Sequence, residues 1–62
     1  MKSSEILKHG RELAKSNGLT LKIDNKNFIN GRKSYKVTYR ESGLTKWERM
    51  TLESAYDSLC GL

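Results

Sequence analysis

The side chains that could carry out chemistry in this 62-residue chain are few. His9 is its one histidine and Cys60 its one cysteine, whereas a structural zinc site needs four nitrogen or sulfur ligands. We expect Cys60 to lie on the buried side of a helix as a small hydrophobe. The acidic residues Glu53 and Asp57 suit the solvated start of a helix better than an acid–base pair. Together with the lack of a glycine-rich phosphate loop, this predicts a protein that is not an enzyme and that needs no metal or cofactor.

The basic residues give a stronger signal. The net charge is +5 and the pI is about 9.6. Residues 19–50 hold eight basic and three acidic side chains, whereas residues 51–62 hold two acidic side chains and no basic ones. A basic excess concentrated in one part of a small domain favours an anionic partner, and nucleic acid is the commonest of these.

The periodicity of the apolar residues predicts a helix at each end of the chain. Residues 5–17 carry apolar side chains at helical spacing, and Ser3 and Ser4 offer hydroxyls that could cap the first turn. A second helix is expected over residues 52–60, with Thr51 as its N-cap. Both helices have one apolar face, so each must pack against another element.

Between the helices, the pattern changes to that of a sheet. Strict alternation over residues 19–24 predicts a half-buried strand, and Asn30-Gly31 predicts a tight hairpin turn into a second strand over residues 34–41. A two-residue loop would put the apolar residues of the two strands on opposite faces. We therefore expect a bulge over residues 25–27, or a loop that is one residue longer. A third strand is expected over residues 44–50.

These elements predict a single α+β domain over residues 1–62. Its order is helix, three antiparallel strands, helix, with both helices on one sheet face and the other face open to solvent. A chain of this length buries only about 60% of its unfolded surface, which leaves room for one modest core. One cysteine, an N-terminus without an apolar signal region and the lack of a long apolar run together predict a cytoplasmic protein that does not enter membranes.

The open sheet face is the predicted binding surface. If Tyr35, Val37 and Tyr39 face the helices, the residues that alternate with them share the solvent side. We expect this side to bind nucleic acid, DNA rather than RNA, chiefly through phosphate contacts. The predicted contact residues are five basic side chains and one threonine: Lys22, Arg32, Lys33, Lys36, Thr38 and Arg40. A solvated strand face whose lysines prevent edge-to-edge aggregation would show the same pattern.

Two families show a related arrangement. The order of elements resembles that of double-stranded-RNA-binding domains, although residues 52–57 are acidic where that family has a lysine-rich helix start. The second half of the chain is similar to the three-stranded DNA-binding modules of tyrosine recombinases. That similarity lies in turn and core positions: Gly31, Tyr35, Val37, Tyr39, Gly43, Thr51 and Ala55. It implies a sheet whose face enters the major groove of DNA.

The alternative hypothesis is a protein-binding inhibitor or adaptor. Trp47 and Arg49 are its candidate partner contacts, together with an exposed sheet edge that could accept a further strand. We expect Trp47 to be partly buried, because so small a domain has little other core material. The small size and the high lysine and asparagine content are typical of phage or prophage accessory proteins. The chain could act as a monomer or as a homodimer.

Overall fold

The computed structural model describes residues 2–62. Five elements follow one another: α1 (Ser3–Ser16), β1 (Leu19–Ile29), β2 (Arg32–Tyr39), β3 (Thr45–Met50) and α2 (Leu52–Cys60). The strands form one antiparallel sheet in the order β1-β2-β3, so β2 is central and β1 and β3 are its edges. This confirms the predicted α+β fold.

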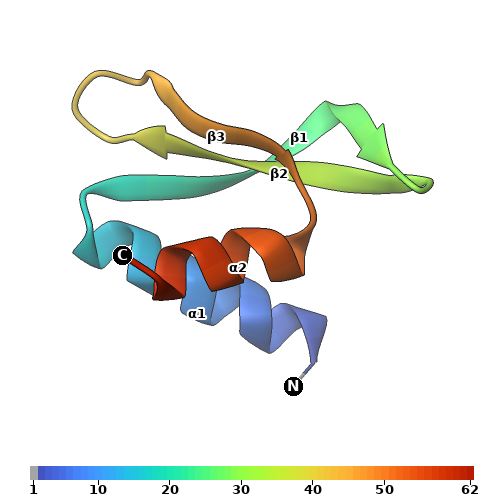
Figure 1. The fold of residues 1–62 in the computed structure, drawn as a ribbon, viewed down its shortest axis with the longest axis horizontal. Helices are drawn as coiled ribbons and strands as arrows, with labels where there is room; N and C mark the ends of the chain where they lie inside the picture. The colour runs from blue at the N-terminus through green and yellow to red at the C-terminus, as the bar shows by residue number, and fades with distance from the viewer. Residues whose placement is uncertain (1) are drawn as a thin grey trace.

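The two helices form one layer beneath a strongly twisted sheet, as Figure 1 shows. They lie side by side and run in the same direction, with both N-termini at the end of the molecule where β1 turns into β2. Helix α1 packs against α2 and on β1, while α2 also packs on β2 and β3. In the part of the chain that the structure describes, no helix is long and apolar enough to cross a membrane.

The helix starts agree only in part with the prediction. The N-cap of α1 is Lys2, whose extended backbone leads into a helix that already includes Ser3 and Ser4. An N-cap residue must keep a non-helical backbone, so the prediction that these serines cap the helix was wrong. The start of α2 is as predicted, since the Thr51 hydroxyl accepts a hydrogen bond of 3.1 Å from the backbone N–H of Ser54.

The core lies between the helices and the lower face of the sheet. Its buried apolar residues come from all elements except β3: Ala14, Leu19, Leu21, Val37, Leu52, Ala55 and Leu59. Gly10 lets α1 approach β1 closely, because a Cβ atom there would lie 2.9 Å from Cδ2 of Leu21. Cys60 is exposed, so its predicted burial was wrong. The buried face of α2 is fully supplied by Leu52, Ala55 and Leu59, and Cys60 is turned away from it at the last position of the helix.

The predicted bulge between β1 and β2 is present. Asp24 pairs with Ser34, and the next pair is Phe28 with Lys33, so residues 25–27 are extra on β1. The loop itself has two residues, Asn30 and Gly31, with φ of 51° and 78°. Both angles are positive, as a type I′ hairpin turn requires. The bulge alone therefore puts the apolar residues of β1 and β2 on the same face, and a loop of three residues is not needed.

Candidate nucleic-acid interface

The centre of the candidate interface is a pair of lysines on neighbouring strands. Lys22 of β1 lies directly opposite Lys36 of β2. The residues beside them, Leu21 and Val37, are buried against the helices, so the two lysines point to the other side of the sheet. Side chains directly opposite on antiparallel strands have Cβ atoms about 5 Å apart, and like charges there oppose folding. The fold therefore holds two positive charges where one anionic group could contact both.

An acidic residue borders this pair and organises the bulge. The carboxylate of Asp24 accepts hydrogen bonds from the side-chain amide of Asn27, at 2.7 Å, and from the backbone N–H of Lys26, at 3.0 Å. The bond from Asn27 contributes most to a lowered pKa of Asp24, followed by the bond from Lys26. Together with the nearby ammonium of Lys36, they hold this pKa below its usual value of 3.8. Asp24 thus fixes the shape of the bulge and offsets part of the positive charge of Lys36.

The rest of this sheet face is less open than predicted. Thr38 lies between Thr20 and Thr45 in a row across all three strands, and only 6% of it is exposed. Ser34 is fully buried, and its hydroxyl oxygen has no hydrogen-bond partner among residues 2–62. Thr38 is therefore no surface contact. Between Ser34 and Thr38, this side of β2 reaches solvent only through Lys36.

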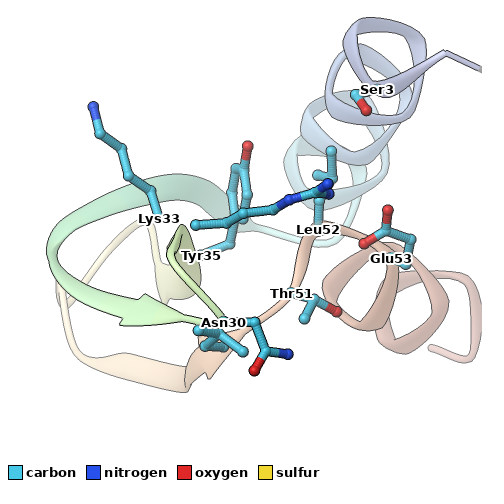
Figure 2. Close-up of a pocket in the computed structure, with 9 residues that line it drawn as sticks. Ser3, Asn30, Lys33, Tyr35, Thr51, Leu52 and Glu53 are labelled. Atoms are coloured by element: carbon cyan, nitrogen blue, oxygen red, sulfur yellow. The ribbon is translucent and has the colours of Figure 1, made fainter.

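Arg32 and Lys33 lie at the far end of the hairpin, where both are exposed. They line an open groove of about 660 Å³ between the hairpin and the N-termini of the two helices. The groove is completed by residues of the turn, of β2 and of the helix starts: Ser3, Ile29, Asn30, Tyr35, Thr51, Leu52 and Glu53. In Figure 2 the Lys33 side chain extends away from the helices, while the Glu53 carboxylate lies on the helix side. Lys33 and Glu53 thus lie on opposite sides of the groove.

Phe28 is a surface residue that the sequence interpretation missed. It pairs with Lys33 directly after the bulge, and 59% of it is exposed. It belongs neither to the buried core nor to the partly buried residues packed against that core. A signal was available, because Phe28 follows four polar residues and precedes the Asn30-Gly31 turn, which places it at a hairpin end rather than over a helix.

Arg40 lies at the opposite end of the sheet. Strand β2 ends at Tyr39, and Arg40 begins the turn into β3, where its backbone N–H donates to the carbonyl of Gly18 at 3.1 Å. It lines a second, smaller hollow of about 550 Å³ with Gly18, Tyr39, Glu41 and Ser42. The structure therefore separates the predicted contact set into the Lys22–Lys36 pair, the Arg32–Lys33 end and the isolated Arg40.

A cation–aromatic cluster stands near Arg40. The ammonium nitrogen of Lys46 lies 4.9 Å from the ring centroid of Trp47 and 5.4 Å from that of Tyr39. It also donates a hydrogen bond of 3.3 Å to the Tyr39 hydroxyl. Trp47 lies opposite Val37 and packs against the core, so the expectation that it is partly buried is confirmed. In this turn Leu44 is 67% exposed.

Arg49, the other candidate partner contact, has an unusual backbone. Its φ is 53°, a left-handed conformation that side chains other than glycine, asparagine and aspartate seldom adopt. Between the pairs Val37–Trp47 and Tyr35–Met50, β2 has the single residue Lys36 where β3 has two, Glu48 and Arg49. Arg49 is thus the strained residue of a second bulge, and it is exposed.

Groups suited to other chemistry are sparse. Among the described residues there is no cluster of three or more His, Cys, Asp or Glu side chains that could hold a metal ion. Tyr56 lies next to Cys60, and the charge of the ionised thiol, together with desolvation, raises the pKa of Tyr56. Both residues lie on α2, and the Tyr56 ring is close to Gly10 of α1.

Comparison with known proteins adds no family to this description, since no family model, no curated protein and no solved structure matches the chain.

Proposed function

We propose that this protein binds nucleic acid through the β1–β2 hairpin, chiefly by contacts between basic side chains and phosphate groups. The contact residues are Lys22, Lys36, Arg32 and Lys33, which we call the hairpin surface. The observation that carries the proposal is the direct pairing of Lys22 with Lys36. Two like charges held opposite each other oppose folding, whereas a bound phosphate would turn the same arrangement into a favourable one.

The proposal is narrower than the sequence alone suggested. Thr38 is omitted because it is buried, and Arg40 is omitted because it lies in the turn at the other end of the sheet. The remaining contact residues are lysines and arginines, which bind phosphate groups. Contacts to phosphates do not distinguish one base from another. We therefore expect binding with little sequence preference. A cytoplasmic location, which a short chain with a single cysteine favours, forms part of this proposal.

The test is fluorescence anisotropy with labelled single-stranded and duplex oligonucleotides over a range of salt concentrations. The double variant K22A/K36A should bind on the order of tenfold more weakly at low salt, and the slope of log affinity against log salt should fall by about 1.5. The matched control is K8A/K15A, which removes the same charge from exposed positions on α1. Its slope should stay close to that of the unmodified protein.

Two results would contradict the proposal: no binding by the unmodified protein even at low salt, or equal losses in the two double variants. The fold of K22A/K36A should be intact, because the substitution relieves a repulsion of a few tenths of a kcal/mol, on the order of other cross-strand pairs. Urea denaturation checks this, and an unchanged or slightly raised midpoint attributes the lost affinity to the lost charges.

A second candidate function is protein binding at the β2–β3 turn, as an inhibitor or adaptor. Its specific support is the exposure of Leu44, at 67%, beside Tyr39, at 41%. Exposed apolar residues at a turn can serve as anchors for a partner. Trp47 is unsuitable for testing this, because it packs against the core. Leu44→Ser should abolish salt-insensitive binding to a protein partner and leave nucleic-acid binding unchanged.

A further inference from the structure

We propose that Phe28 stacks on a nucleotide base and that the preferred ligand is a single strand. This inference rests on the proposed function, since the hairpin surface supplies the phosphate contacts that bring the strand to Phe28. It goes further by assigning a residue outside the basic set and by naming the form of nucleic acid.

The first observation is that the chain leaves its only phenylalanine outside a small core. Phe28 is 59% exposed, although burying such a side chain is worth about 1.5–3 kcal/mol. The bulge over residues 25–27 creates this position, because it shifts the register by three residues and sets Phe28 opposite Lys33. The bulge is itself held by two hydrogen bonds to Asp24. The exposed ring is thus fixed in place by a structured segment.

The second observation is the charge around the ring. Lys33 is the cross-strand neighbour of Phe28, with Cβ atoms expected about 5 Å apart. Arg32 pairs with the adjacent residue Ile29, and Lys26 of the bulge is exposed. A base stacked on Phe28 would therefore have its own and neighbouring phosphates close to basic groups. Aromatic side chains combined with a basic surface are the arrangement by which proteins bind single strands with little sequence preference.

The third observation concerns the shape that the ligand must have. The Lys22–Lys36 pair lies along the hairpin and points away from the helices, whereas Arg32 and Lys33 lie at the end of the hairpin, beside the groove. A flexible single strand can bend along the hairpin and contact both groups. Duplex DNA is stiff over such distances, and its bases already have both faces stacked. The duplex would have to be kinked and unstacked before Phe28 could contact a base.

The experiment compares a labelled oligothymidylate of about 12 nucleotides with a hairpin duplex of the same length, a range that fits known single-strand site sizes. The unmodified protein should bind the single strand about tenfold more tightly or better. Phe28→Ala should weaken that binding by about 5- to 150-fold, the range that corresponds to the loss of one stacked base. Its salt slope should be unchanged, because no charge is removed.

Two further variants identify what Phe28 contacts. Phe28→Trp keeps an aromatic face and should retain the affinity, whereas Phe28→Leu keeps only apolar volume and should bind as weakly as Phe28→Ala. If Phe28→Leu binds like the unmodified protein, the ring is no stacking platform and the inference is wrong. A circular dichroism spectrum of each variant should match that of the unmodified protein, because Phe28 lies outside the core.

Failure of this inference can be told apart from failure of the proposed function. If Phe28→Ala binds normally, or if the duplex is preferred, while K22A/K36A still loses affinity, stacking is overturned and the phosphate-binding surface stands. If the unmodified protein binds neither probe at low salt, both proposals fall. In that case the exposed ring would be an apolar anchor for a protein.

Discussion

The two ends of the sheet use the same kinds of residue for different purposes. At the β1–β2 end, Phe28 is exposed beside Lys33. At the β2–β3 end, Trp47 is half-buried against the core, and Lys46 lies over its ring. The difference is one of position relative to the helices, because Trp47 lies opposite the buried Val37 while Phe28 lies beyond the bulge. A basic residue beside an aromatic ring therefore marks a binding surface only where the ring has no core to pack on.

The largest expected effect is a difference in stability between the alanine variants of Trp47 and Phe28. Trp47→Ala should lower the free energy of unfolding by about 2 kcal/mol, less than for a fully buried tryptophan because Trp47 is only partly covered. Phe28→Ala should change it by no more than about 0.5 kcal/mol, as is usual for surface substitutions. Urea denaturation monitored by circular dichroism measures both values. Equal losses would show that Phe28 is also part of the core and would remove the contrast.

The second prediction concerns the two non-glycine residues with positive φ among residues 2–62, Asn30 in the β1–β2 turn and Arg49 in the bulge of β3. Arg49→Gly should stabilise the protein by about 1 kcal/mol, because glycine adopts the left-handed conformation without the clash of a Cβ atom. Asn30→Gly should change stability by only a few tenths of a kcal/mol, since asparagine tolerates this conformation. Thermal denaturation of the two variants provides the comparison. A destabilised Arg49→Gly protein would mean that the arginine side chain makes a compensating contact.

The third prediction concerns the pH dependence of the two connections, the bulge before the β1–β2 turn and the β2–β3 turn. The bulge before the first turn is held by the Asp24 carboxylate, whereas the turn before β3 is held by a hydrogen bond from the Leu44 backbone N–H to the Ser42 hydroxyl, at 3.2 Å. The lowered pKa of Asp24 means that its contribution to stability is complete above 3.8 and is lost as pH falls through the folded-state pKa. The amide resonance of Lys26 should therefore shift with a midpoint below 3.8, while that of Leu44 stays constant. A Lys26 midpoint above 3.8 would contradict the hydrogen-bonded bulge.

The smallest expected effect is a gain of affinity. Glu48 is exposed and lies in the segment of β3 opposite Lys36, so its charge opposes an approaching phosphate. Glu48→Gln should tighten nucleic-acid binding by about twofold, the size expected of one exposed charge interaction. Glu41→Gln removes the same charge from the β2–β3 turn and should have less effect. Anisotropy titrations at one low salt concentration measure the difference, and a larger gain from Glu41→Gln would move the binding surface to that turn.

Much of the fold could be predicted from the sequence, because helical spacing, strand alternation and Asn30-Gly31 are local signals. The bulge over residues 25–27 was predictable as well, since without it the apolar residues of β1 and β2 could not share a face. Alternation also indicates which side of a strand a residue takes, and Lys22 and Lys36 do lie together. It does not indicate what covers that residue. Thr38 is buried although it lies on the same side of β2 as Lys36, and such burial depends on how the whole sheet is arranged.

The exposure of Phe28 was missed because it, too, depends on what lies against the strand. An apolar pattern does not state how far the helix layer extends beneath the sheet. The end of the β1–β2 hairpin extends past the helix starts (Figure 1), and Phe28, near that end of β1, is exposed. Arg40 was grouped with the other basic residues because the second strand was expected to reach residue 41, whereas β2 ends at Tyr39. Strand ends depend on hydrogen bonds to the partner strand, which the local sequence does not specify.

The central claim is that nucleic acid contacts the β1–β2 hairpin rather than the β2–β3 turn. The most direct test is an NMR titration of the ¹⁵N-labelled protein with an oligothymidylate, following the amide resonances of the whole chain. We expect the largest shifts at Lys22, Phe28, Arg32, Lys33 and Lys36, with little change over residues 40–46. Shifts concentrated in residues 40–46, or none at any ratio of ligand to protein, would contradict it.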